Sequence, residues 1–266
     1  MISINQRKQI TSLNQKKYRI RYGLFLAEGD KITREALSPA TNPFSEVREI
    51  FATPAWLQEN QELVNASNAT FTEASTVELK RVSTLQTPPR VIALLSLPEL
   101  PHSPPLPGNN LLLMLESIRD PGNLGTILRT ANWFGITSVI CSKDSADAWN
   151  PKVVQASMGA ILRTTIHYIP LIPFLESYSA KGGEVYGTHL RGKSIYSTPV
   201  TPPSVVIFGN ESQGLSPNLE KFVTTPIRIP DHPPGKSGTE SLNIAASVAA
   251  VCAIIRNQSA STQNGN

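Results

Sequence analysis

Cysteine, histidine and long apolar runs are all scarce in this sequence, and each shortage excludes a class of protein. Its 266 residues include only Cys141 and Cys252, too few and too far apart for a disulfide framework, so we expect two buried thiols in a cytoplasmic protein. The four histidines are scattered without the spacing of a metal site, so no metal is expected. No apolar run reaches the roughly 18 residues of a membrane helix, and no apolar segment follows the basic N-terminus. We therefore expect neither a membrane span nor a secretory signal.

Three common enzyme motifs are missing as well. No G-x-G-x-x-G follows the first strand pattern, which argues against a dinucleotide-binding Rossmann domain. No G-x-S-x-G is present, which argues against a Ser–His–Asp hydrolase. Gly235-Lys236-Ser237 resembles the end of a P-loop, but Pro230 stands where that loop requires its first glycine.

The charge is weakly basic overall but concentrated near the N-terminus. The net charge is +4, with 40% hydrophobic and 17% charged residues, as in a globular protein. Tyr18 and Tyr22 are interleaved with a basic cluster in the first 21 residues: Arg7, Lys8, Lys16, Lys17, Arg19 and Arg21. Such a cluster is typical of a surface that contacts RNA phosphates, although a solvated helix face has the same composition.

A proline-rich stretch divides the chain. Residues 98–110 contain five prolines and predict a linker between an N-terminal domain, residues 1–97, and a C-terminal domain, residues 111–257. The polar residues 258–266 predict a disordered tail. In the first domain we expect strands at 23–28, 47–52 and 91–95 and helices at 6–19, 56–63 and 76–82.

The second domain alternates the two kinds of pattern. Strands are expected at 111–115, 138–141, 164–167, 184–188, 205–208 and 227–229, and helices at 123–134, 151–158, 172–180, 219–222 and 241–256. This alternation predicts an α/β fold with a mostly parallel sheet and helices on both faces.

Polar residues follow three of the expected strands. After Leu111–Leu115 comes a Pro/Gly turn, and then a helix pattern that carries Asn123 and Arg129, the latter about 140° away from Leu124 on the helical wheel. The second strand end carries Gly209-Asn210-Glu211, and the third is followed by Ser241-Leu242-Asn243. Ligands of α/β folds bind at the carboxyl ends of parallel strands, so these residues are candidates for one site.

Together the three segments resemble the signature motifs of the SpoU/TrmH family of S-adenosylmethionine-dependent RNA ribose methyltransferases, which belongs to the SPOUT superfamily. The resemblance implies transfer of a methyl group to a ribose 2′-hydroxyl, a C-terminal trefoil knot and a homodimer. It assigns catalytic or positioning roles to Arg129, Asn123, Glu211, Ser241 and Asn243. It assigns cofactor binding to Thr188, Leu190, Gly209, Ile229 and Leu242.

The role of Arg129 stays open between two readings. The family resemblance makes it the base, yet a guanidinium stays protonated at physiological pH, so it could instead orient the hydroxyl and stabilise the developing alkoxide.

Two further features bear on the substrate. Residues 25–29 (FLAEG) and 34–37 (REAL) resemble the opening of the family's substrate-binding domain, which is similar to small ribosomal RNA-binding proteins and favours ribosomal RNA over transfer RNA as the partner. RNA contacts are expected from Lys16, Lys17, Arg19 and Arg21. The loop from Ile229 to Ser241 is longer than is usual in the family, and its Lys236 could meet a phosphate.

The alanine-rich last helix predicts the subunit interface, with burial inside one subunit as the other reading. Two alternative functions are a transfer-RNA methyltransferase of the same fold and an RNA-binding protein that has lost its cofactor.

Overall fold

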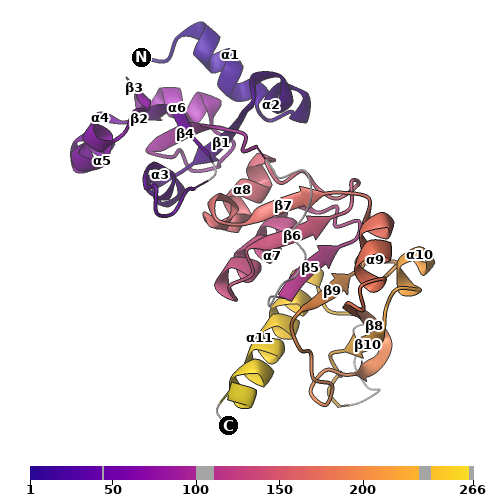
Figure 1. Ribbon diagram of the computed structural model, residues 1–266. Coiled ribbons are helices and arrows are strands. Elements are labelled where there is room, and N and C mark those ends of the chain that lie inside the picture. The colour runs from indigo at the N-terminus through magenta and orange to yellow at the C-terminus, as the bar shows by residue number, and fades with distance from the viewer. Residues whose placement is uncertain (44, 100–110, 234–240, 264–266) are drawn as a thin grey trace. The chain divides into compact units, whose positions relative to one another are not determined.

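The computed structural model divides the chain into two compact units (Figure 1). The first comprises residues 1–99 and 147–163, and the second comprises residues 100–146 and 164–266. The structure describes residues 1–43, 45–99, 111–233 and 241–263, with side chains as far as residue 259. Most of the predicted linker, residues 100–110, lies outside the described residues.

The first unit is built on a four-stranded sheet in the order β1-β4-β2-β3. Its strands are β1 (Leu24–Glu28), β2 (Val47–Ala52), β3 (Thr70–Glu73) and β4 (Val91–Ser96). The β1/β4 and β2/β4 pairs are antiparallel, and β2/β3 is parallel. The sequence patterns found β1, β2 and β4, but β3 was missed because this short edge strand has no buried residue.

Six short helices come from residues 1–99 of this unit. They are α1 (Ile4–Ser12), α2 (Lys16–Tyr22), α3 (Asp30–Leu37), α4 (Pro54–Glu59), α5 (Gln61–Ala66) and α6 (Thr76–Val82). The single helix expected over residues 6–19 is interrupted at Gln15, which is extended (φ −103°, ψ 131°) and precedes α2. The expected helix at 56–63 is likewise two helices, which meet at Asn60.

A segment from the middle of the chain completes the first unit. Helix α8 (Pro151–Ser157) and the 3-10 turn η1 (Ala160–Leu162) belong to this compact unit, and both lie within the predicted second domain, residues 111–257. The ring of Trp149 packs on Phe25 with centroids 4.7 Å apart. Arg163 donates from Nη1 to Glu35 Oε2 at 2.9 Å. Sequence periodicity describes a single element, so it could not show with which sheet α8 packs.

The second unit has a six-stranded sheet in the order β10-β8-β9-β5-β6-β7, and every neighbouring pair is parallel. The strands are β5 (Leu111–Leu115), β6 (Ser138–Cys141), β7 (Thr165–Tyr168), β8 (Glu184–Ser194), β9 (Ser204–Phe208) and β10 (Thr225–Arg228). The predicted α/β fold with a mostly parallel sheet is therefore confirmed.

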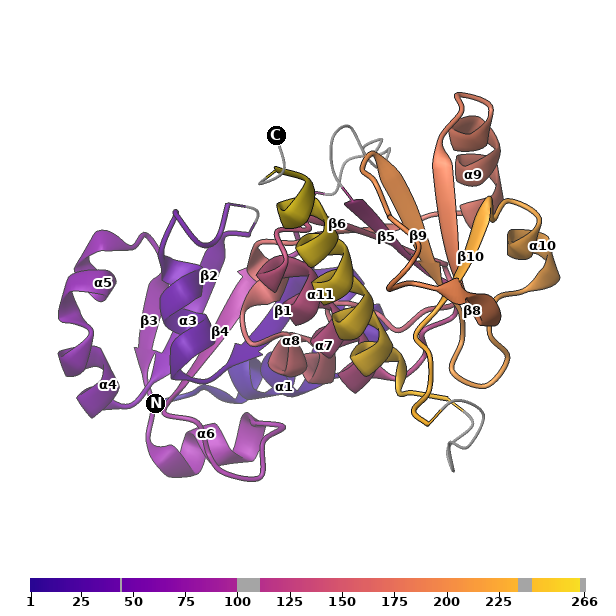
Figure 2. The same ribbon diagram turned by 90° about the horizontal axis from the view of Figure 1, so that it is seen from below.

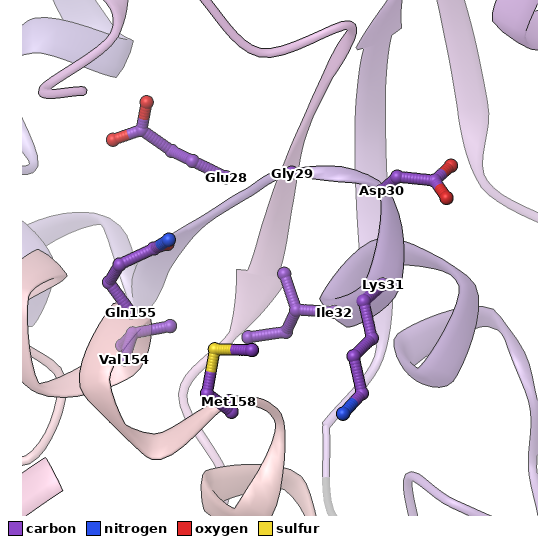
Figure 3. A pocket seen from close by; sticks show the side chains of 8 residues that line it. All are labelled: Glu28, Gly29, Asp30, Lys31, Ile32, Val154, Gln155 and Met158. Carbon is purple, nitrogen blue, oxygen red and sulfur yellow. The ribbon is translucent and has the colours of Figure 1, made fainter. Parts of the chain in front are cut away.

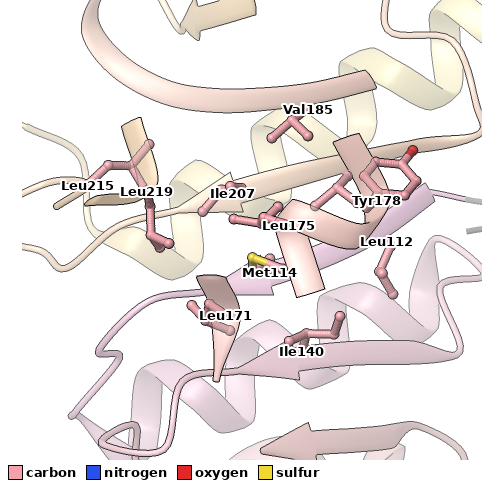
Figure 4. Close-up of a cluster of buried hydrophobic side chains, with 11 residues drawn as sticks. Leu112, Met114, Ile140, Leu171, Leu175, Tyr178, Val185, Ile207, Leu215 and Leu219 are labelled. Atoms are coloured by element: carbon pink, nitrogen blue, oxygen red, sulfur yellow. The ribbon is translucent and has the colours of Figure 1, made fainter. Parts of the chain in front are cut away.

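Helices cover both faces of this sheet. On one face, α9 (Leu171–Ser179) and α10 (Pro217–Glu220) pack on a buried cluster that includes Met114, Ile140 and Ile207 (Figure 4). On the other side lie α7 (Pro121–Trp133) and α11 (Ile244–Gln263), which pack against each other (Figure 2). Strands β5 and β9 are buried at every position, which explains their unbroken apolar sequences.

The two cysteines are buried free thiols, as expected. Burial raises the pKa of Cys141 and of Cys252 to about 12, because an apolar environment disfavours the thiolate.

The prediction of a disordered tail from residue 258 is wrong as far as residue 263, because α11 continues to Gln263. Gln258 explains part of this extension: its Nε2 donates to Ile195 O and Thr198 O, and its Oε1 accepts from Val200 N. These contacts fix the end of α11 to the loop after β8. The polar composition of residues 258–266 does not reveal such contacts. Residues 264–266 of the predicted tail lie outside the described residues.

Candidate functional site

The first predicted motif forms the start of α7. Asp120 caps the helix, since its Oδ1 accepts from the backbone N–H of Asn123 at 2.7 Å, and Pro121 occupies the first helical position. Leu124, Ile127 and Leu128 are fully buried, so the helix is fixed by its apolar face. Asn123 is consequently held, partly exposed, in the first turn of a rigid helix that follows the loop after β5.

Three predicted residues from three separate motifs are joined by hydrogen bonds. Asn123 donates from Nδ2 to Glu211 Oε1 at 2.8 Å, and its Oδ1 accepts from Asn243 Nδ2 at 3.0 Å. Both ends of the Asn123 amide are therefore engaged, which fixes its orientation. We call Asn123, Glu211 and Asn243 the amide–carboxylate chain.

Asn243 has a second role as the cap of α11. Its Oδ1 accepts from Ala245 N at 2.9 Å and Ala246 N at 3.3 Å, and its backbone carbonyl accepts from Ser247 N at 2.9 Å. The helix therefore begins at Ile244 rather than at the expected residue 241. The cap holds the side chain in place, so its Nδ2 is presented to Asn123.

Glu211 lies in a closed turn after β9. Asn210 and Gly214 exchange two backbone hydrogen bonds across this turn, at 3.0 and 2.9 Å. A Cβ atom at Gly209 would lie 2.2 Å from the backbone carbon of Gly214, so only glycine fits there. The glycine of the motif is thus required by the turn that presents Glu211.

A second set of contacts fixes this turn to the loop after β5. Asn210 Nδ2 donates to Ser117 O at 2.9 Å. The Ser117 hydroxyl in turn donates to Asp144 Oδ2 at 2.6 Å. Hydrogen bonds from Ser117 and Ser142 lower the pKa of Asp144, so it stays ionised as an anchor. Neither Ser117 nor Asp144 is predicted from the sequence, because residues 27 positions apart carry no pairing signal.

Strand β8 carries the predicted residues Thr188 and Leu190 on an irregular stretch. Its pairing with β10 jumps from Gly187↔Pro226 to Lys193↔Ile227, so residues 188–192 bulge out of the ladder. The strand was expected to end at Thr188 but continues to Ser194, where β10 still pairs with it. A Cβ at Gly192 would lie 2.6 Å from the Ile227 backbone, so glycine allows the two strands to meet again.

The remaining predicted cofactor residues are placed as follows. Thr188 donates from Oγ1 to Ile207 O at 3.2 Å, while the Leu190 side chain is 71% exposed. Ile229 is half-buried just after β10, and Leu242 is 52% exposed before α11. The side chains of Leu190 and Leu242 are therefore both accessible to a ligand.

Arg129 is not joined to the amide–carboxylate chain. Its side chain is exposed on α7 and has no recorded hydrogen bond or ion pair to any described residue. Ser241 is also exposed, two residues before the Asn243 cap. The structure therefore leaves the Arg129 guanidinium accessible to a ligand.

One residue of the predicted RNA contact is corrected. Arg19 is 2% exposed and pairs with Asp147 at 2.5 Å, while its Nη1 donates to Leu13 O at 2.6 Å. It is a packing residue because its donors are used inside the first unit. By contrast, the predicted contacts Lys16, Lys17 and Arg21 are exposed on α2, but Lys236 lies outside the described residues.

Two negative predictions can be compared with the described residues. Among the residues whose placement is given, no three histidine, cysteine or acidic side chains are grouped as a metal site would require. No helix in that part of the chain is long and apolar enough to cross a membrane.

Comparison with known proteins identifies the family. The sequence profile of the SpoU rRNA methylase family matches residues 110–253, which contain all three motifs. The chain belongs to this family. A second profile, the MRM3-like substrate-binding domain, matches residues 5–93 of the first unit.

Individual relatives agree with the SpoU assignment. The chain is 32% identical over 246 residues to a tRNA/rRNA methyltransferase of Synechocystis whose name marks it as uncharacterized, covering 91% of this chain and 86% of that one. It is 28% identical to the 23S rRNA (guanosine(2553)-2′-O)-methyltransferase RlmP of Bacillus subtilis, covering 91% and 92%.

Among solved structures, an RNA methyltransferase of the TrmH family from Porphyromonas gingivalis shares 37% identity with a TM-score of 0.83. The match covers 97% of this chain and 99% of that one. The similarity therefore extends over both units of this SpoU family member.

Proposed function

We propose that this chain transfers a methyl group from S-adenosylmethionine to a ribose 2′-hydroxyl of ribosomal RNA. The observation that carries the proposal is the amide–carboxylate chain, because it brings together one residue from each of the three SpoU motifs. RlmP, which aligns along nearly its whole length, is named for 23S rRNA 2′-O-methylation and supports the substrate.

The residues present suit the cofactor. Leu190 and Leu242 offer exposed apolar surface for an adenine ring, and the strand ends at Gly209 and Ile229 offer backbone groups for its polar edge. Thr188 keeps acceptor capacity on its hydroxyl, since that hydroxyl donates to Ile207 O. When bound, S-adenosylmethionine supplies an electrophilic methyl group on a sulfonium.

The chain's own polar groups then position the RNA. Glu211 and Asn243 hold the Asn123 amide at a fixed orientation, and an oriented dipole needs no reorganisation during the reaction. The exposed Arg129 guanidinium has no hydrogen bond or ion pair with a described residue, so we assign it the ribose phosphate and the charge that develops on the 2′-oxygen. Ser241, exposed beside the cap, would donate to substrate or cofactor.

We propose a homodimer formed through α11 and the end of α7. Ala246 and Ala253 are exposed on α11, and Trp133 at the end of α7 is 83% exposed. The two helices are linked, since Arg256 Nε donates to Phe134 O at 2.8 Å. An exposed tryptophan beside small residues is the kind of surface that a second subunit covers.

Three further parts of the proposal rest on the family. They are a trefoil knot in the second unit, an RNA-binding role for the first unit, and methylation of ribosomal RNA in the cytoplasm. The exposed Lys16, Lys17 and Arg21 support the RNA-binding role, because lysine and arginine side chains contact phosphates.

The test compares Asn123→Ala with the matched control Thr126→Ala, an exposed residue on the same helix. Labelled methyl transfer from S-adenosylmethionine is measured on unmodified ribosomal RNA and on transfer RNA, followed by digestion to nucleosides. We expect the wild type and Thr126→Ala to place the label on 2′-O-methylnucleosides of ribosomal RNA, and Asn123→Ala to place none. Label in transfer RNA alone, or on a base, would contradict the proposal. So would no calorimetric heat at millimolar cofactor, which would favour a binding protein without activity.

A further inference from the structure

The first unit contains a cavity of about 190 Å³ between the start of α3 and helix α8 (Figure 3). Its lining comes from Glu28–Ile32 and from Val154, Gln155 and Met158. The cavity is smaller than the roughly 300–1,000 Å³ of pockets that enclose whole drug-sized ligands. It therefore has room for one planar ring system and is too small for S-adenosylmethionine.

The two acidic residues that line the cavity already have partners. The Glu28 carboxylate accepts from Thr84 N at 3.1 Å and from the hydroxyls of Ser83 and Thr84. Asp30 Oδ1 accepts from the indole nitrogen of Trp56 and from Arg34. Figure 3 shows both carboxylates directed away from Met158.

Lys31 is the basic residue that lines the cavity. It is exposed at the cavity and has no recorded ion pair with any described residue. Asp30 is paired with Arg34, and the Glu28 and Asp30 carboxylates are both directed away from Met158, so the Lys31 ammonium is the charged group on the Met158 side of the cavity. A positive charge at this place favours a ligand with an anionic group there.

The rest of the lining combines apolar surface with one amide. Ile32 and Val154 are buried, and Met158 is 41% exposed at the opening. The Gln155 side chain is exposed and has no recorded hydrogen bond to a described residue. Its amide can both donate and accept, which matches the mixed donor and acceptor edge of a nucleobase.

The backbone holds Met158 in this exposed position. Met158 is left-handed (φ +51°), which is uncommon for a residue other than glycine, and it is followed by the left-handed Gly159 (φ +91°). A Cβ at Gly159 would lie 1.9 Å from Glu35 Oε2, and Glu35 is itself paired with Arg163. The turn is thus fixed by packing, and it presents a polarisable thioether of the kind that contacts ring systems favourably.

We propose that this cavity binds one unstacked nucleobase of the RNA substrate, with Lys31 against the adjoining phosphate. The inference rests on the proposed RNA methyltransferase function and adds a recognition site that no residue of its three motifs lines. The base would lie against Ile32, Val154 and Met158, with its polar edge on the Gln155 amide. Single-stranded RNA is the expected form, because only unstacked bases expose both a face and an edge.

The test uses the full chain and short RNA oligonucleotides that carry one 2-aminopurine. Gln155→Leu removes the amide, Gln155→Trp fills the cavity from its rim, and Lys31→Ala removes the charge. Lys152→Ala is the matched control, since Lys152 is exposed on the same helix but does not line the cavity. All three substituted positions are exposed, so the fold should tolerate the four changes.

We expect the wild type and Lys152→Ala to bind single strands more tightly than a duplex and to increase the 2-aminopurine emission. Gln155→Leu and Gln155→Trp should each lose about tenfold in single-strand affinity, the scale of one base contact, without the rise in emission. Lys31→Ala should lower the slope of log affinity against log salt by about 0.7.

Several outcomes would overturn the inference. Unchanged single-strand affinity in both Gln155 variants would contradict the nucleobase site. Equal losses of affinity for single strands and for the duplex would also contradict it, because they would show a contact with the RNA backbone only. Displacement of the RNA by micromolar nucleoside monophosphates would show a site for free nucleotides instead. Methyl transfer by the wild type is measured in parallel: its absence contradicts the proposed function, whereas its presence with unaffected binding contradicts only the nucleobase site.

Discussion

The buried ion pair between Arg19 and Asp147 allows a direct test of whether Arg19 stabilises the first unit or binds RNA. Arg19 donates from Nε at 3.2 Å and from Nη2 at 2.5 Å to the same oxygen, Asp147 Oδ2, and from Nη1 to Leu13 O at 2.6 Å. The exposed fractions of the two side chains are 3% and 16%. Arg19→Met keeps the length of the side chain but leaves a carboxylate and a carbonyl without these donors.

The expected cost follows from the burial of the pair. Removing one partner of a buried ion pair costs about 3–5 kcal/mol, because the other charge stays desolvated. The double variant Arg19→Met/Asp147→Leu should be less destabilised than either single variant, since it removes both charges. Arg48→Met is the control: its pair with Glu46 is more than half exposed on both sides, and breaking such a pair costs about 0–1 kcal/mol.

The measurement is urea unfolding followed by tryptophan fluorescence in a Trp133→Phe background. Trp56 and Trp149 then remain, and both belong to the first unit, so the signal reports the unit that contains the ion pair. The free energy of unfolding should fall in Arg19→Met with little change in the denaturant slope. A loss below about 1 kcal/mol, the surface-pair value, together with weakened RNA binding, would refute the reasoning and return Arg19 to the RNA surface.

Three other predictions concern function. Arg129→Ala should abolish methyl transfer while leaving cofactor affinity within a few-fold, because its exposed side chain makes no hydrogen bond or ion pair with a described residue; turnover by the folded variant would disprove its role. Replacing Lys16, Lys17 and Arg21 by alanine should weaken RNA binding and lower its salt slope by about 2, at roughly 0.7 for each phosphate contact; an unchanged slope would make α2 merely a solvated face. Light scattering at micromolar concentration should give a dimer mass that Trp133→Glu reduces to a monomer mass, and a monomeric wild type would contradict the proposed interface.

The sequence by itself determined the elements whose signals are local. The strands 111–115 and 138–141 have the predicted ends, because apolar runs buried on both faces stop where polar residues begin. The helix at 76–82 also has its predicted bounds, since Ser75 and Glu78 form a capping box. Each of the three SpoU motifs is a short stretch of consecutive or nearly consecutive residues. Residues such as Asn123 and Glu211 can therefore be identified from the sequence.

Only the tertiary structure decided how these pieces meet. Asn123 bonds to residues 88 and 120 positions away, and no periodicity connects such positions because the path of the chain places them together. Arg19 and Lys17 have the same charge in the same cluster, yet one is buried against Asp147 and the other is exposed. The sequence pattern predicted helix α8, but it did not show that this helix packs on the sheet of the first unit. A sequence records which groups need partners, and the three-dimensional path of the chain decides which partner each of them finds.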